Sequence, residues 1–305
     1  MHLLFIFIFL YLTEYIKINM RYYNIIIIII CILIIMFLFQ FPTFPTFPTF
    51  PNEFYNKNTN LSLNKVIKNC NRLNNQKYTV HAIQHNVVFL YSFDYKTMPI
   101  YYNKMKGSFI KYCNYHGYKF LEIDHSKDTN KISPYWNRVS DLVKLSNLYD
   151  SNTIFIYVDL DTYINPKYNY LSIYNFLNSI DDIENNISDI YIGNDPYDIS
   201  NAGIIIVRNT DWSKQFLNLW WSKYNPKDWI FSNNKWICLN NGKLCDWARR
   251  GYEQGEFNLI YRNNEINAQD NIKILHHSLI SNNNPNIDSF IWHFYGTVYI
   301  AYLLV

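Results

Sequence analysis

Residues 154–162, IFIYVDLDT, constrain the fold of this chain more than any other segment. An apolar run rich in β-branched and aromatic residues ends here in Asp159 and Asp161. Such a run predicts a buried strand. Because side chains alternate along a strand, the two acids are expected to point the same way. Two carboxylates at a strand end suit a hard divalent cation that holds a diphosphate, although such a pair alone also fits loop or helix-capping acids.

The segments around this strand alternate between the two kinds of secondary structure. Strands are predicted at 86–92, 118–123 and 154–158, and helices at 98–117 and 134–148. This alternation predicts an α/β fold with a parallel, doubly wound sheet. Ligands bind at the carboxyl ends of the strands of such sheets, which is where Asp159 and Asp161 are expected to lie.

Composition bounds the class of protein. The 305 residues are 49% hydrophobic and 19% aromatic, so a sizeable core is available. The net charge of +3 is spread along the chain without a long Lys/Arg tract, which argues against nucleic acid as a partner.

The N-terminal region is predicted to direct the chain to a membrane. Residues 22–41 are nearly all apolar and approach the roughly 20 residues that span a bilayer. Lys17 and Arg21 precede them, so residues 1–21 are expected to form a cytosolic tail, with Met20 as an alternative start. A cleaved signal peptide is the competing interpretation, but no small-residue cleavage site follows. The sequence thus predicts a single-pass type II membrane protein with a lumenal catalytic domain, of the Golgi or ER type.

A spacer is predicted between this span and the globular domain. A proline stands at every third position from Pro42 to Pro51, and an Asn-rich stretch follows. This pattern favours an extended stem over residues 42–78, with a single domain over 79–305. In that domain Cys238 and Cys245 flank a turn signal, which is compatible with a short disulfide or with two free thiols.

Polar residues after the acid pair supply further candidates. Gly203, in the turn Asn201-Ala202-Gly203, would let a ligand or backbone approach closely. Glu253-Gln254 opens a predicted helix, and His293 precedes a glycine. Each has an ordinary alternative, since Glu253 is otherwise a surface acid at a helix start and His293 a core residue.

Several motifs occur in one order between about residues 85 and 297. They are His116-Gly117-Tyr118, Pro134-Tyr135-Trp136-Asn137-Arg138, Tyr157-Val158-Asp159-Leu160-Asp161, Asn201-Ala202-Gly203, Trp220-Trp221, Glu253-Gln254 and His293-Phe294-Tyr295-Gly296. This ordered set resembles the glycosyltransferases of the GT-A fold, a Rossmann-like nucleotide-diphospho-sugar transferase fold. It is most similar to glycosyltransferase family 34, which includes fungal galactosyl- and mannosyltransferases and plant xyloglucan xylosyltransferases.

The resemblance implies roles for individual residues. The implied ligands of Mn²⁺ or Mg²⁺ are Asp159, Asp161 and His293. The implied donor-binding residues are Ser92, Phe93, Arg138, Asp159, Asn201, Ala202 and Gly203. Glu253 and Gln254 match the pair that lies near the reacting carbon.

The implied activity is metal-dependent transfer of a hexose or pentose, with retention, from a UDP- or GDP-sugar to a glycan or glycoprotein acceptor. Family members often carry a lysine two residues after the motif glycine, where this chain has Val298; Arg138 or Lys273 are candidates to replace its charge. Val298 favours one alternative, a weak or inactive GT-A domain that binds glycans or partners. An inverting GT-A transferase is the other.

Overall fold

The computed structural model describes residues 61–75, 86–93, 102–128, 132–195, 200–233, 235–285 and 287–295. The expected tail and membrane span, most of the expected stem, and Val298 lie outside these residues. In the described part of the chain, no helix is both long enough and apolar enough to cross a membrane.

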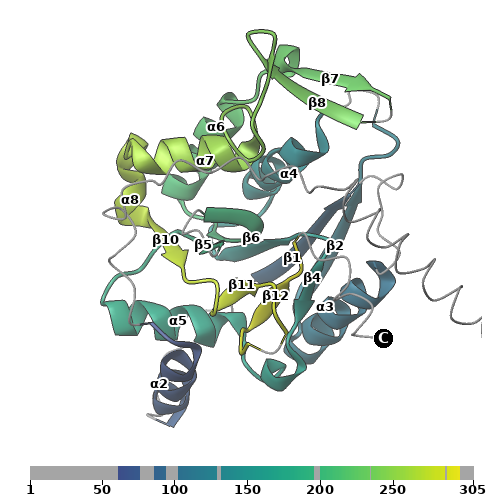
Figure 1. Ribbon diagram of the computed structural model, residues 1–305. Coiled ribbons are helices and arrows are strands. Elements are labelled where there is room, and N and C mark those ends of the chain that lie inside the picture. Colours follow the sequence, from purple (N-terminus) through teal and green to yellow (C-terminus); the bar gives the residue numbers. More distant parts are fainter. Residues whose placement is uncertain are drawn as a thin grey trace, which may run out of the picture. The chain divides into compact units, whose positions relative to one another are not determined.

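A six-stranded sheet forms the centre of the described fold, in the order β10-β5-β6-β3-β1-β2 (Figure 1). Its strands are β1 (Asn86–Phe93), β2 (Lys119–Asp124), β3 (Thr153–Val158), β5 (Ile190–Asn194), β6 (Ser200–Arg208) and β10 (Ile272–Leu275). β1 runs parallel to β2 and β3, and β5 runs parallel to β10, but β6 is antiparallel to both β3 and β5. The predicted parallel sheet is therefore wrong in one respect, because the sheet is mixed.

Helices cover both faces of this sheet, and side chains of β1 show how the faces divide. Phe89 and Tyr91 enter a core shared with α3 (Tyr102–His116) and α5 (Ile173–Glu184). Val88 and Leu90 face the opposite core, which contains Ala268 of a short helix and side chains from three longer helices. These are α4 (Pro134–Leu148), α6 (Asp211–Ser222) and α7 (Glu253–Arg262). A strand buried on both faces reads as a continuous apolar run, which is why the sequence revealed β1 and β3.

A further helix, α2 (Leu63–Asn75), packs against α5. Leu63, Val66 and Cys70 are buried in the same core as α5, and the Ser179 hydroxyl donates a 2.7 Å hydrogen bond to the Val66 carbonyl. α2 lies inside the segment 42–78 that the sequence assigns to a stem. The globular fold therefore begins upstream of residue 79. The apolar residues of α2 lie at helical spacing and form one buried face, and the Asn and Lys residues between them make the segment look like a stem in the sequence.

Two small sheets complete the described fold. One contains β11 (Ile280–Asn282), β12 (Ile291–His293) and β4 (Thr162–Ile164); the other contains β7 (Trp229–Ser232), β8 (Lys235–Asn240) and β9 (Lys243–Leu244). β7 and β8 form a hairpin at the top of Figure 1. Cys238 and Cys245 form a disulfide there, which decides between the two alternatives left by the sequence. The short helices are η3 (Pro166–Tyr168), η4 (Pro226–Asp228), η5 (Glu265–Asn267) and α8 (Ala268–Asn271).

Candidate functional site

Asp159 and Asp161 lie in the turn by which the chain leaves β3 and enters β4. The Thr162 amide donates to the Asp159 carbonyl at 3.1 Å, and the Thr162 hydroxyl donates to the same carbonyl at 2.6 Å. The Asp159 amide donates to the Gly203 carbonyl of β6 at 2.8 Å. The turn, and not strand alternation as predicted, brings the two carboxylates together.

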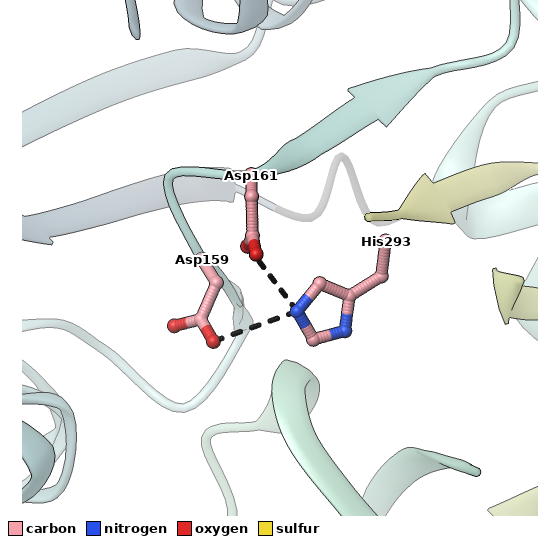
Figure 2. Close-up of side chains that lie close together, drawn as sticks. All are labelled: Asp159, Asp161 and His293. Carbon is pink, nitrogen blue, oxygen red and sulfur yellow. Dashed lines mark ion pairs between the residues drawn. The ribbon is translucent and has the colours of Figure 1, made fainter. Parts of the chain in front are cut away.

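His293 joins these two carboxylates from the end of β12. Its Nε2 lies 3.2 Å from Oδ1 of Asp161 and 3.7 Å from Oδ2 of Asp159 (Figure 2). β12 pairs antiparallel with β4 so that His293 stands opposite Thr162, and the Phe294 amide donates to the Asp161 carbonyl at 2.9 Å. One possible ligand atom from each of the three residues lies within 4.8 Å of the others.

The surroundings of His293 suit a metal ligand. A Cβ on Gly203 would lie 1.9 Å from Cε1 of His293, so the imidazole ring fits only because residue 203 lacks a side chain. The Ser281 hydroxyl lies 3.2 Å from Nδ1. An Nδ1–H bond to Ser281 would leave the Nε2 lone pair facing Asp159 and Asp161, as in metal sites where an outer partner orients the histidine.

The charges of the three residues support the same interpretation. Burial alone would raise the pKa of Asp161, but the neighbouring His293 outweighs it and the pKa is lowered. Burial alone would lower the pKa of His293, but Asp161 raises it above its ordinary value. A divalent cation bound here would compete with protons for the imidazole and the carboxylates. Two carboxylate oxygens and one imidazole nitrogen suit Mn²⁺ or Mg²⁺ with phosphate oxygens better than a closed zinc site.

Arg138 connects this candidate metal site to the predicted reaction centre. Its Nη2 lies 3.0 Å from Oδ1 of Asp159, and its Nη1 donates to the Ala202 carbonyl at 2.7 Å and lies 3.6 Å from Oε1 of Glu253. The guanidinium stands over the ring of Tyr157, 5.0 Å from its centroid. The Arg138 side chain, 11% exposed, thus lies among carboxylates that already compensate its charge.

Glu253 and Gln254 lie at the start of α7, as predicted. Glu253 is 4% exposed, and its Oε2 has no hydrogen-bond partner among the described residues. Burial raises the pKa of Glu253 to about 7, against the opposing charge of Arg138. The Gln254 side-chain oxygen accepts a 3.0 Å hydrogen bond from the Ala202 amide.

The sequence predicted a turn at 201–203, but these residues lie in β6, where they are held on both sides. Besides the bond from Gln254, the Asn201 side-chain oxygen accepts a 2.9 Å bond from the Gly203 amide. Because β6 is antiparallel to β3, this first part of β6 lies at the carboxyl end of β3. The structure therefore brings together the predicted residues Arg138, Asp159, Asp161, Asn201, Ala202, Gly203, Glu253, Gln254 and His293.

Ser92 and Phe93, the other two predicted donor-binding residues, end the neighbouring strand β1. The Ser92 hydroxyl donates to Oδ2 of Asp141 at 2.7 Å, and the same oxygen lies 2.8 Å from Nε2 of His125. The Phe93 ring packs against Tyr102, with centroids 5.5 Å apart. These two residues thus lie at the same sheet edge, with Ser92 in a polar cluster of its own.

Sequence reasoning missed that cluster. Nδ1 of His125 lies 2.7 Å from Oδ2 of Asp128, so the imidazole stands between two carboxylates. Burial alone would lower the pKa of His125, but Asp141 and Asp128 together raise it. His125 follows the end of β2, and its position after a predicted strand was the available signal. Lys273, the other suggested replacement for the missing lysine, lies in β10. Burial lowers its pKa, against the opposing charges of Glu184 and Asp181.

Comparison with known proteins addresses the fold. No protein-family model matches the sequence, and a comparison with curated proteins gives no match. Among solved structures, one similar chain is a glycosyltransferase involved in the glycosylation of the major capsid of PBCV-1, with a TM-score of 0.50, 17% identity, and coverage of 72% of this chain and 100% of that one.

Two other solved glycosyltransferases are more distant. One is apo GlyE of Streptococcus pneumoniae TIGR4, with a TM-score of 0.34, 9% identity, and coverage of 63% of this chain and 45% of that one. The other is the galactosyltransferase LgtC, with a TM-score of 0.36, 9% identity, and coverage of 70% of this chain and 87% of that one. The likeness to the PBCV-1 enzyme confirms that this chain has a glycosyltransferase fold.

Proposed function

We propose that this protein is a metal-dependent glycosyltransferase that moves a hexose or pentose from a nucleotide-diphosphate sugar to a glycan or glycoprotein acceptor. The observation that carries the proposal is the convergence of Asp159, Asp161 and His293 at the carboxyl end of β3, within 4.8 Å of one another. The glycosyltransferase fold supports it. A divalent cation bound there would neutralise the charge that develops on the leaving diphosphate.

The remaining residues of the site have roles that follow from their positions. Arg138 holds the Asp159 carboxylate and the Ala202 carbonyl in fixed places. Gln254 holds the Ala202 amide. The buried Oε2 of Glu253 is available to accept a hydrogen bond from a hydroxyl of the donor sugar. Together they would orient the sugar next to the diphosphate site.

We propose retention of the anomeric configuration and membership of family 34 on the strength of the ordered motifs. In a retaining transfer the acceptor hydroxyl attacks the face from which the phosphate leaves, and its proton passes to that phosphate. Gln254 then contributes by facing the positive charge that develops on the sugar. A covalent bond between the sugar and Glu253 is the less favoured route.

We also propose, from the sequence, that residues 22–41 anchor the protein as a type II membrane protein with its catalytic domain in a Golgi- or ER-type lumen. Lys17 and Arg21 before the span support this orientation. Protease protection of intact vesicles tests it, and digestion of the catalytic domain from the cytosolic side would refute it.

The activity is tested with the full-length protein in detergent, incubated with UDP- and GDP-sugars and Mn²⁺. The expected result is metal-dependent release of the nucleotide and, with a suitable acceptor, a product in which an α-linked donor gives an α-linkage. A β-linked product would remove the family 34 assignment and leave the fold. The absence of nucleotide release from every donor would contradict the proposed enzyme.

A further inference from the structure

A cluster of four aromatic side chains lies beside the proposed reaction centre. It consists of Tyr135 on α4, Trp229 on β7, and Trp247 and Tyr252 on the segment between β9 and α7. The Trp247 ring meets the rings of Tyr135 and Tyr252 edge to face, with both centroid distances at 5.1 Å. Trp229 packs against Tyr135 at 5.6 Å and Tyr252 at 5.1 Å. We call these residues the aromatic cluster.

The members of this cluster differ in exposure. Trp229 is buried, whereas Trp247 is 62% exposed. Edge-to-face contacts fix the orientation of a ring while they leave part of its face uncovered. Trp247 is thus an exposed aromatic ring held by two others, and not a loop side chain that packs against nothing.

The cluster is continuous with the reaction centre. Tyr252 caps α7 and directly precedes Glu253. Tyr135 lies one helical turn before Arg138 on α4, on the same side of the helix. Burial raises the pKa of the Tyr135 hydroxyl, and the charge of Glu253 raises it further against the opposing charge of Arg138. Two of the four rings thus adjoin residues of the proposed reaction centre, Tyr252 next to Glu253 in the chain and Tyr135 one turn from Arg138.

The disulfide packs against the segment between Trp247 and Glu253. Gly251 has a φ of +94°, and a Cβ there would lie 2.7 Å from Sγ of Cys238 and 3.0 Å from Sγ of Cys245. The Gly251 carbonyl accepts a 3.0 Å hydrogen bond from the Trp136 indole. The hairpin, the disulfide and α4 thus fix the chain between Trp247 and Glu253.

We propose that the exposed face of Trp247 binds a sugar ring of the acceptor glycan, with Tyr135 and Tyr252 completing the subsite; this inference rests on the proposed function. An amphipathic aromatic ring suits a sugar, whose axial C–H groups form an apolar face bordered by hydroxyls. A glycan is favoured over a protein or lipid surface because the aromatic cluster adjoins the proposed reaction centre, where an acceptor must end.

The test compares full-length wild type with Trp247→Ala, Trp247→Phe and Tyr115→Ala. Tyr115 is the control, because it is 69% exposed on α3 and its ring packs against His116. Binding of neutral glucose, mannose and xylose hexasaccharides is measured by calorimetry with Mn²⁺ and UDP or GDP present. Donor hydrolysis and transfer to the hexasaccharides are measured in parallel.

Trp247→Ala is expected to weaken binding of the preferred hexasaccharide, and to raise its KM in transfer, about tenfold, as for other exposed aromatic anchors. Trp247→Phe should recover part of the loss, and Tyr115→Ala should match wild type. The inference is overturned if wild type binds none of the hexasaccharides, or if Trp247→Ala binds them as tightly as wild type does. The proposed function has its own test: it fails if wild type releases nucleotide from none of the donors. If glycan binding still depended on Trp247 in that case, the sugar subsite would stand without the transferase activity.

Discussion

The imidazole of His293 fills the space that a side chain on residue 203 would need. A Cβ at Gly203 would lie 1.9 Å from Cε1 and 2.6 Å from both ring nitrogens of His293. Two residues distant in sequence, one in the first half of β6 and one at the end of β12, are thus matched in size. The site requires glycine at 203 because of this ring, and the φ of Gly203 is not the reason.

Gly203→Ala should therefore displace His293. We expect Mn²⁺ affinity and activity to fall, and the free energy of unfolding to drop by about 1–3 kcal/mol, as for other overpacked interiors. Calorimetry with Mn²⁺ and denaturant unfolding measure the two effects. Gly107→Ala on α3 is the matched control: nothing lies within 4 Å of the added Cβ, so the fold should gain about 0.5–1 kcal/mol. Unchanged Mn²⁺ affinity in Gly203→Ala would show that His293 is not a ligand.

Asp161→Asn should lose roughly a hundredfold or more in activity without unfolding, because it removes a charged ligand that faces His293. His293→Ala should raise the Mn²⁺ concentration needed for half-maximal activity. Steady-state rates over a Mn²⁺ titration measure both. Asp182→Asn, an exposed acid paired with Arg72, is the control and should behave as wild type. Full activity of Asp161→Asn at limiting Mn²⁺ would place the metal elsewhere.

Glu253 should make stability depend on pH. Burial raises its pKa from the ordinary 4.5 to about 7 in the folded state, so folding favours the protonated form. This contribution is complete below pH 4.5 and is lost as the pH rises through 7. Glu253→Gln keeps the neutral form at every pH. Wild type should therefore lose roughly 3 kcal/mol relative to this variant between pH 4 and pH 8.

Denaturant unfolding in EDTA at several pH values measures this difference. Unfolding free energies of wild type and Glu253→Gln that change in parallel with pH would mean that folding does not raise the pKa of Glu253. In activity assays, Glu253→Gln should be mild if the side chain binds donor hydroxyls and inactivating if Glu253 is a nucleophile.

Gln254→Ala should lower turnover strongly and leave nucleotide affinity nearly unchanged, because its contact is expected to strengthen as charge develops on the sugar. The structure adds a second effect, since the Gln254 oxygen also holds the Ala202 amide. Gln254→Glu keeps that acceptor. If kcat is equal for wild type and Gln254→Glu and low only for Gln254→Ala, Gln254 acts by positioning the Ala202 amide. Values of kcat and of the dissociation constant of UDP or GDP separate these cases.

Replacing both Cys238 and Cys245 with Ser should destabilise the fold by about 2 kcal/mol, the value expected for a short closed loop. Because the sulfurs pack against Gly251, transfer should fall more than Mn²⁺ binding does. Dithiothreitol should reproduce the effect in wild type and add nothing in the double variant. If neither the double substitution nor dithiothreitol changes the transfer rate, the hairpin does not support the reaction centre.

Local patterns predicted much of this fold. The helix at 134–148 and the strand before Asp159 follow from Pro134 and from a continuous apolar run. The antiparallel direction of β6 could not be predicted, because periodicity carries no information on strand direction. The helix α2 was missed because Asn and Lys dilute its apolar spacing. Without β6 reversed, residues 201–203 would lie at the wrong end of the sheet.

The candidate site was predicted residue by residue where it coincides with ordered motifs. The pairing of Gly203 with His293 could not be predicted, since it depends on how β12 docks beside β6. The same holds for the cluster of Ser92, His125 and Asp141, whose members come from β1, the end of β2 and α4. Contacts between distant segments arise from tertiary packing and leave no local signal.

The path of the chain from β3 into β4 has a thermodynamic consequence. Asp159 and Asp161 leave the six-stranded sheet, whereas His293 belongs to the sheet of β11, β12 and β4. A cation held by all three would cross-link the two sheets. By linkage, any force that separates the sheets must also weaken metal binding, and saturating metal must resist their separation. Metal at a hundred times its dissociation constant would thus add about 2.7 kcal/mol to the free energy of unfolding.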